Sequence, residues 1–400
     1  MTSESAQLLR SWPLIDAHND LPAALRSSAG YSVERLDCAR PELHTDIPRL
    51  RAGAVSAQFW SVWVPSHLPP AEAVVATLEQ IDAVHRLVAR YPNDFELALS
   101  ADDIDLAHGR SRIASLIGIE GGHSIASSLG VLRMLFRLGA RYMTLTHTDD
   151  TEWAASATGL RQTTGLSETG VDIIREMNRI GMVVDLSHTS ESTQVDALAV
   201  SSAPVMFSHS SARALVDHPR NVSDVMLEQV ARSGGVVHVT FVPEFVSADA
   251  AAWTAAFELE KSALGGVPRH YPAAPKPGET AEAARQRNLI DRSLVEHAAR
   301  DAERQLAKWV ASHPCPVSTM ADVADHLDHV RAVAGIDHVG IGGDFDGTTE
   351  VSDGLGDVSG YPELFALLSQ RRWSDDELGK LAGGNILRVL RDVESVARLA

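Results

Sequence analysis

Five side chains of the types that bind metal ions lie far apart in this 400-residue sequence, and each follows a short apolar run. They are His18, Asp20, Glu120, His188 and His209. Histidine nitrogens and carboxylate oxygens are common zinc ligands. Ligands so dispersed meet only if the apolar runs are strands of one sheet or barrel, because the carboxyl ends of parallel strands share one rim. The pattern therefore predicts a fold and a metal site together.

No single member of this set would establish a metal site. His18 and Asp20 are two residues apart, so on a strand both side chains point to the same side. A lone strand-end histidine more often bonds only to a neighbour, and Glu120 alone would be read as a capping or salt-bridged residue. Glu120 nevertheless precedes Gly121 and Gly122, and its two oxygens could bridge two cations. The repetition at His188 and His209 is what favours a shared site.

Further candidates follow other apolar runs. Asp344 and Asp346, in VGIGGDFDG, could bind metal, act as general acid and base, or stabilise the turn. We expect Asp344 to shuttle protons and Asp346 to be structural. His147 is a candidate oxyanion donor and Arg220 a candidate carboxylate clamp, although Arg220 taken alone would be a surface charge.

The elements that must position these residues alternate between strand-like and helical patterns. Such short apolar runs between helices are typical of a buried parallel sheet. Eight runs predict a single (β/α)₈ TIM barrel over residues 1–400, as in metal-dependent amidohydrolases. The runs are 14–17, 55–64, 113–119, 142–146, 182–186, 205–208, 236–241 and 338–341. Helices are expected at 71–89, 124–138 and 375–390, and one from Ser167 or Thr169 to Gly181.

The segment 243–314 interrupts this alternation. It contains a proline-rich stretch, GVPRHYPAAPKPGET, and then a charged helical pattern over about 282–313, with Leu289, Leu294, Leu306 and Trp309 as packing positions. We interpret it as an insertion over the barrel that borders the mouth of the site. A surface excursion without a catalytic part is an equally good interpretation.

Composition restricts the class of protein. The formal charge of -18, from 35 basic and 53 acidic residues, would repel nucleic acid and anionic membrane surfaces. No signal peptide, lipid anchor or membrane-spanning run is recognised. Cys38 and Cys315 are too few for a disulfide scaffold. We therefore expect a cytoplasmic protein with no nucleic-acid or membrane partner, and the sequence leaves open whether the two thiols meet.

Taken together, several segments resemble the membrane dipeptidase (renal dipeptidase) family, peptidase family M19. They are LIDAHNDLP, LIGIEGGHSI, LTHTDDTEWAAS, GLSETGVDIIREMNRIGMVVDLSH, FSHSSARAL, HPRNVSD, VGIGGDFDG and the stretch from GLGDVSGYPELF to NILRVL. The resemblance covers about residues 11–392 and is weakest across the insertion. It implies a metal-dependent barrel of the amidohydrolase type.

The resemblance also implies roles for single residues. One zinc ion would be held by His18, Asp20 and Glu120, and a second by Glu120, His188 and His209. His147 would meet the scissile carbonyl oxygen, Arg220 the free carboxylate of a dipeptide, and Asp344 would be the acid/base. Paired zinc ions lower the pKa of a shared water, so a bridging hydroxide would attack L-Xaa-L-Xaa or L-Xaa-D-Xaa dipeptides. The family is commonly dimeric, so a homodimer is one state open to this chain.

The sequence departs from the family pattern after His147. Asp150 stands where an Asn is frequent and Ala155 where an Asp is frequent, while Asp149 adds a carboxylate. Our hypothesis is that Asp149 and Asp150 favour dipeptides with a basic first residue. A solvated loop is the simpler alternative.

Three other functions are compatible with parts of the pattern. Ser124 in GHSIA resembles a variant nucleophile elbow of a serine hydrolase, although Ser124 is also explained as a helix cap. A mononuclear relative could act as an N-acyl-amino-acid deacylase. A barrel could also keep metal only for structure or serve as a binding module, but structural zinc sites are normally closed by four protein ligands. Metal analysis with chelator-sensitive hydrolysis separates these functions.

Overall fold

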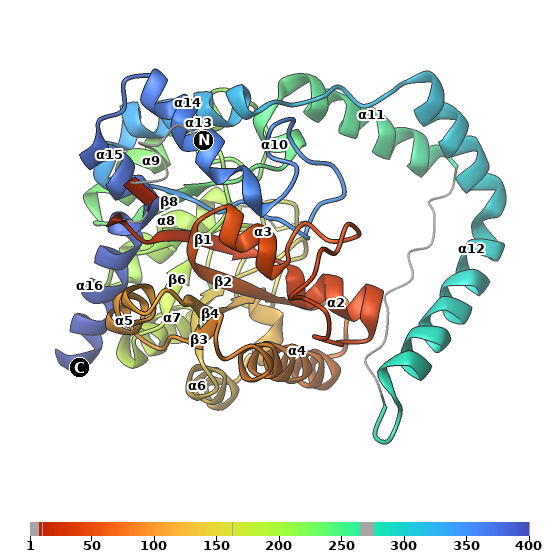
Figure 1. Cartoon of the computed structure of the whole chain (residues 1–400), viewed down its shortest axis with the longest axis horizontal. Helices are drawn as coiled ribbons and strands as arrows, with labels where there is room; N and C mark the ends of the chain where they lie inside the picture. The colour runs from red at the N-terminus through yellow and green to blue at the C-terminus, as the bar shows by residue number, and fades with distance from the viewer. Residues whose placement is uncertain (1–7, 10, 162, 265–275, 400) are drawn as a thin grey trace.

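Parallel strands form one sheet in the computed structural model, which describes residues 8–9, 11–161, 163–264 and 276–399 (Figure 1). The strands are β1 (Leu14–Asn19), β2 (Val55–Trp63), β3 (Phe95–Leu97), β4 (Ile113–Glu120), β5 (Ala140–Thr144), β6 (Val183–Asp185), β7 (Met206–Phe207), β8 (Val236–Val239) and β9 (Val339–Ile341). Their order is β2-β1-β9-β8-β7-β6-β5-β4-β3.

The sheet closes on itself because β2 also pairs with β4. This parallel pairing runs from Ala57 opposite Ala114 to Trp63 opposite Glu120. Eight strands thus form a closed barrel, which confirms the predicted (β/α)₈ fold. The ninth strand, β3, pairs with β4 outside the closed ring. It was not predicted, since three residues are too short to form a recognisable apolar run.

Helices surround the barrel and connect its strands. In chain order they are α2 (Leu21–Ala29), α3 (Ile47–Ala52), α4 (Pro70–Arg90), α5 (Ala101–Gly109), α6 (Leu129–Arg137), α7 (Glu168–Ile180), α8 (Glu191–Val200), α9 (Asp224–Arg232), α13 (Met320–Ala334), α14 (Tyr361–Gln370), α15 (Asp375–Gly379) and α16 (Asn385–Leu399). Helix α7 matches its sequence signals: the Ser167 side chain accepts a hydrogen bond from the Gly170 N–H, and Gly181 ends the helix at φ 85°.

The helix predicted from Ser124 to Leu138 begins later than expected. Residues Gly122–Ile125 form a 3₁₀ turn, and α6 starts at Leu129 with Ser128 as its N-cap. The prediction that Ser124 caps a helix is therefore wrong. Ala126 and Ser127 have φ angles of 48° and 55°, and this left-handed backbone separates the turn from the helix.

The predicted helix 375–390 is also interrupted. Between α15 and α16 the chain forms a π-helical turn, Lys380–Gly384. Gly383 lies against Pro13 and Ile15 of the first strand region, where a Cβ atom would overlap the Pro13 carbonyl oxygen. This close approach gives the wide turn a packing reason.

The segment predicted as an insertion holds α10 (Pro243–Val246), α11 (Ala248–Ala263) and α12 (Ala281–Ser312). In Figure 1 α11 and α12 form an arch beside the barrel, and α12 comes close to α2. Trp309 of α12 lies 5.7 Å from Trp253 of α11 between ring centroids. Leu306 is buried and Leu289 is exposed. Residues 265–275, most of the proline-rich stretch, and the side chain of Leu294 lie outside the described residues.

The structure also describes the two cysteines and the length and polarity of the helices. Cys38 and Cys315 are both free thiols. Among the described residues, every helix is too short or too polar to cross a membrane.

Candidate active site

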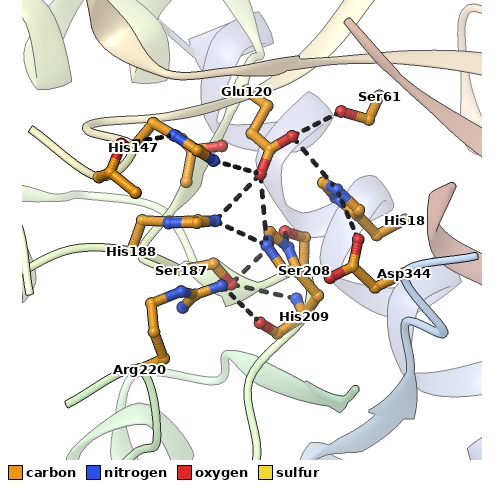
Figure 2. A network of polar contacts seen from close by, with 12 residues as sticks. His18, Ser61, Glu120, His147, Ser187, His188, Ser208, His209, Arg220 and Asp344 are labelled. Carbon is orange, nitrogen blue, oxygen red and sulfur yellow. Dashed lines mark hydrogen bonds and ion pairs between the residues drawn. The ribbon is translucent and has the colours of Figure 1, made fainter. Parts of the chain in front are cut away.

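The five predicted metal ligands come together at the carboxyl ends of the barrel strands, and Figure 2 shows His18, Glu120, His188 and His209 among them. His18 lies near the end of β1, and Asp20 follows that strand directly. Glu120 is the last residue of β4. His188 and His209 follow β6 and β7 by three and two residues. The barrel rim thus joins residues that span almost 200 positions of sequence.

The carboxylate of Glu120 divides its two oxygens between two groups of side chains. Its Oε2 lies 3.4 Å from His18 Nε2, which is also 3.3 Å from Asp20 Oδ2. Its Oε1 lies 3.0 Å from His188 Nε2 and 3.4 Å from His209 Nε2. Figure 2 shows His18 to the right of Glu120, His188 to its left and His209 below it, and the His18 and His209 ring centroids are 3.7 Å apart. This division of the two oxygens is the arrangement expected of a carboxylate that bridges two cations.

The donor set fits such cations. His18 Nε2 is buried and has no hydrogen-bond partner among the described residues, although three carboxylates lie near it. His188 Nε2 and His209 Nε2 are 2.9 Å apart. Zinc bonds of about 2.0–2.1 Å in a tetrahedral site place neighbouring ligand nitrogens roughly 3.3 Å apart. The observed separations of donor atoms cluster around that value, so small adjustments would allow each group to share an ion.

Three side chains that the sequence analysis missed hold these ligands. The Ser61 hydroxyl donates to Glu120 Oε2 at 2.8 Å, and Ser208 Oγ lies 2.7 Å from His209 Nδ1. The Tyr142 hydroxyl lies 3.0 Å from His18 Nδ1 and donates to the Ala17 carbonyl at 3.2 Å. Such partners orient metal-binding histidines and carboxylates. Polar residues inside otherwise apolar strand runs were the only sequence signal for Ser61 and Tyr142.

Two site residues adopt left-handed backbone conformations that are uncommon for residues other than glycine. His188 has φ 68° and Asp344 has φ 62°. Each lies just after a strand, where the chain turns away from the barrel. The conformations are maintained by the surrounding loops and direct both side chains into the mouth.

Burial sets the protonation of the histidines. It lowers the pKa of His188 and of His209 well below the ordinary histidine value, and the charge of Arg220 adds to this effect. Both rings are therefore neutral near pH 7, which is the form that binds metal. Burial likewise lowers the pKa of His147 to about 4.

The two predicted catalytic side chains flank the ligands. His147 Nε2 lies 3.6 Å from Glu120 Oε1, and its Nδ1 lies 3.1 Å from Thr148 Oγ1. Asp344 Oδ1 lies 3.7 Å from His18 Nε2 on the opposite side. Burial raises the pKa of Asp344 well above the ordinary carboxyl value; His18 opposes this rise and the carboxylates of Asp20 and Glu120 add to it.

Asp346, expected to be structural, connects two loops. Its Oδ1 accepts the His44 N–H at 2.7 Å, and its own N–H donates to His44 Nδ1 at 3.0 Å. These bonds hold the turn that carries Asp344.

Arg220 is buried rather than a surface charge, with 6% of the residue exposed. Its Nη1 donates to Ser210 Oγ at 3.4 Å and its Nη2 to the His209 carbonyl at 3.3 Å. Its Nε has no hydrogen-bond partner among the described residues. Burial lowers the pKa of Arg220 to about 10, so the side chain stays charged at neutral pH. A buried guanidinium with unused donor capacity is suited to binding an anionic group.

Asp150 is engaged by its own loop. Its Oδ1 accepts the Ser156 N–H at 2.7 Å, and its Oδ2 accepts the N–H groups of Leu160 and Arg161, each at 2.9 Å. The Asp149 side chain accepts a hydrogen bond from Ser66. A contact of Asp150 with substrate stays a prediction, and both carboxylate oxygens already accept hydrogen bonds.

Ser124, the alternative nucleophile, is fully buried, and its hydroxyl has no hydrogen-bond partner among the described residues. A serine nucleophile needs a base within hydrogen-bond reach. The geometry thus gives Ser124 no activating partner.

A cavity of about 620 Å³ opens beside the ligands. Its lining includes His147, His188 and Arg220 together with residues of α10 and α11. The predicted insertion therefore borders the mouth of the site. The volume lies within the range of about 300–1,000 Å³ that is usual for small-molecule sites.

The chain is similar to known proteins along nearly its whole length. Residues 2–400 match the model of the membrane dipeptidase family (peptidase family M19). The chain is 37% identical to the dipeptidase verJ of Clonostachys rogersoniana, over 99% of this chain and 88% of that protein. The probable dipeptidase PvdM of Pseudomonas aeruginosa has a similar crystal structure, with a TM-score of 0.80, 23% identity and coverage of 98% of each chain.

A second solved structure extends the comparison. It is a metallo peptidase from Rhodobacter sphaeroides, liganded with a phosphinate mimic of the dipeptide L-Ala-D-Ala. The TM-score is 0.72 at 22% identity, over 96% of this chain and 99% of that one. With the family match over nearly the whole sequence, these findings establish that the chain belongs to the membrane dipeptidase family, peptidase family M19, and is an enzyme of the metallo-dipeptidase class.

Proposed function

We propose that the protein is a binuclear zinc dipeptidase that hydrolyses L-Xaa-L-Xaa or L-Xaa-D-Xaa dipeptides. His18, Asp20 and Glu120 would hold one ion, and Glu120, His188 and His209 the other. The division of the Glu120 oxygens between these two groups is the observation that supports the proposal most directly. Bound there, paired zinc ions supply an acidified water and polarise the peptide carbonyl.

The protein's own residues would then position and protonate the substrate. Arg220 binds the terminal carboxylate, which an extended polypeptide would not offer at this distance from the scissile bond. His147 is neutral near pH 7 and stands beside the ligands. With Nδ1 accepting from Thr148, its Nε2 donates a hydrogen bond to the developing oxyanion.

Proton transfer falls to Asp344. Its carboxyl accepts the proton released by the attacking water and passes it to the leaving amine nitrogen, so one group acts first as base and then as acid. Asp344 lies beside His18 and opposite His147, and this supports an approach to the reacting carbon from the side away from the oxyanion donor. Asp346 keeps this group in place through His44.

The cytoplasmic location and the homodimer stay predictions.

The alternative activity, deacylation of N-acyl amino acids, would use the same ligands and carboxylate clamp, but its substrates have no free amino group. We expect dipeptides to be hydrolysed faster than their N-acetyl derivatives. The reverse preference would favour the deacylase.

The decisive experiment combines metal analysis with hydrolysis. The purified protein should retain about two zinc ions per chain, lose activity on Ala-Ala and Ala-D-Ala in a chelator, and regain it with zinc. Glu120→Gln should abolish activity and reduce the zinc content. Glu363→Gln, an exposed residue of α14, is the matched control and should behave like the wild type. Chelator-resistant hydrolysis or retention of two ions by Glu120→Gln would contradict the proposal.

A further inference from the structure

The cavity is bordered by only part of the candidate ligand group. His147, His188 and Arg220 are among its lining residues, whereas His18 and Asp20 are not. In Figure 2 Arg220 and His188 lie on the side of Glu120 that faces away from His18. If Arg220 holds the substrate carboxylate, the residue that carries this carboxylate lies at the same end. The cavity therefore receives the side chain of the C-terminal residue of the dipeptide, and this inference rests on the proposed function.

The lining of the cavity is acidic in part. Glu244 of α10, Glu258 of α11 and Glu350 after β9 all line it. Glu258 forms an ion pair with Lys261, Nζ to Oε1 2.5 Å. Among the described residues no basic side chain forms an ion pair with Glu244 or Glu350. Of the lysines and arginines in the described part of the chain, only Arg220 lines the cavity.

The balance of charge changes when a dipeptide binds. A substrate carboxylate bound to Arg220 would neutralise the charge of that side chain, which otherwise acts on the Glu244 carboxylate. Glu244 is the deepest of the three carboxylates: it is only partly exposed and accepts a hydrogen bond from the Thr254 side chain. A positive charge on the bound substrate would restore the balance.

Aromatic rings line the same cavity. Phe245 lies under Arg220, with the guanidinium carbon 5.3 Å from the ring centroid. Trp253 and Phe257 are stacked, 5.2 Å apart and 12° from parallel. Trp253 is fixed by a hydrogen bond from its Nε1 to the His313 carbonyl at 2.5 Å. Such rings pack against the aliphatic stem of a long basic side chain and attract its charged end.

We propose that this cavity selects dipeptides whose C-terminal residue is arginine or lysine, and that Glu244 binds the cationic end of that side chain. Glu350 contributes at longer range, and the rings of Trp253 and Phe257 hold the aliphatic part. An aromatic C-terminal residue would fill the same space but would leave the carboxylates unpaired.

The test compares substrates of equal shape and different charge. Zinc-loaded enzyme is assayed with Ala-Arg and with Ala-citrulline, in which a neutral urea group replaces the guanidinium. We expect kcat/KM to favour Ala-Arg by about 5- to 10-fold, the size of one ion pair at a partly exposed site. Glu244→Gln can still accept from Thr254 and should bring the ratio close to one. Glu350→Gln should lower it less.

Glu260→Gln is the matched control, because it removes one negative charge from the same helix, α11, at a residue that does not line the cavity. It should keep the wild-type ratio. If Glu244→Gln fails to fold, raising the NaCl concentration from 0.05 to 0.5 M should still reduce the wild-type preference, because salt screens a partly exposed ion pair.

The outcomes separate the two proposals. Equal kcat/KM for Ala-Arg and Ala-citrulline in the wild type, or an unchanged ratio in Glu244→Gln, would overturn the selectivity proposal and leave the dipeptidase intact. Failure of the zinc-loaded enzyme to hydrolyse any dipeptide would instead overturn the proposed function. A higher rate with Ala-Phe than with Ala-Arg would show that the rings, and not the carboxylates, determine the preference.

Discussion

Removal of the Tyr142 hydroxyl tests how the barrel prepares His18 for metal. The hydroxyl donates to the Ala17 carbonyl and therefore accepts from His18 Nδ1–H. This bond fixes the tautomer, so the lone pair of Nε2 faces Glu120 and Asp20. Tyr142→Phe keeps the ring, which packs 5.3 Å from Phe59, and removes only the group that orients His18.

Two effects of different size are expected. Loss of a partner to a metal-binding histidine weakens metal affinity about 10- to 100-fold, or about 1.4–2.7 kcal/mol. The two groups that lose their hydrogen-bond partner, His18 Nδ1 and the Ala17 carbonyl, belong to buried residues. The free energy of unfolding should therefore also fall by about 1–3 kcal/mol. The affinity loss should concern the ion held by His18, since Tyr142 has no hydrogen bond to His188 or His209 among the described contacts.

Zinc binding measured against a competing chelator, together with urea unfolding, separates the two effects. Tyr91→Phe is the matched control: its buried hydroxyl donates to the Val33 carbonyl and accepts from the Leu36 N–H, both at 3.0 Å, far from the site. Both variants should lose similar stability, and only Tyr142→Phe should lose affinity for one of two ions. Wild-type zinc affinity in a destabilised Tyr142→Phe variant would refute the reasoning.

Three further predictions follow from single residues. Arg220→Lys should raise KM for Ala-Ala about 10- to 100-fold, because lysine lacks the paired N–H donors of the guanidinium. Hydrolysis of Ala-Ala amide, which has no carboxylate, should change little. Equal losses on both substrates would exclude the carboxylate clamp. His326 is buried, its Nδ1 accepts the Ala212 N–H at 2.9 Å, and burial lowers its pKa to about 4. In the unfolded chain it would protonate near pH 6.5. The free energy of unfolding should therefore fall by up to about 3 kcal/mol as the pH is lowered from 6.5 towards 4. His326→Asn should show a correspondingly shallower dependence of unfolding free energy on pH, and an identical slope would contradict this. Asp150→Asn should speed hydrogen exchange in residues 156–161, and an unchanged preference for Arg-Ala over Ala-Ala would reject Asp150 as a subsite for basic first residues.

The candidate ligands could be recognised in the sequence because each is a local feature, and their role as metal ligands stays a prediction. A ligand-type residue directly after an apolar run is visible without knowledge of the fold, and the closed barrel then brings His18, Glu120 and His209 together. The contacts of Ser61 and Tyr142 were not predictable in this way. They depend on strand register across 59 and 124 residues of sequence, which no local pattern encodes.

The errors in the predicted helices have similar physical causes. The start of α6 is set by the left-handed residues Ala126 and Ser127, and helical periodicity does not report on single dihedral angles. The π turn before α16 reflects the packing of Gly383 against Pro13, a contact between opposite ends of the chain. Tertiary structure, and not local helix propensity, determines both the start of α6 and the π-helical turn.

The hydrolytic groups and the wall of the cavity come from different parts of the chain. The candidate metal ligands lie at or just after the ends of β1, β4, β6 and β7, whereas Glu244, Trp253 and Phe257 belong to one excursion between β8 and α13. Mutations could therefore change the sequence or the length of the segment between β8 and α13 without moving any candidate ligand. Substrate preference would diverge among descendants while the hydrolytic chemistry stayed the same, and grafting a foreign excursion between β8 and α13 is a direct route to engineering new preferences.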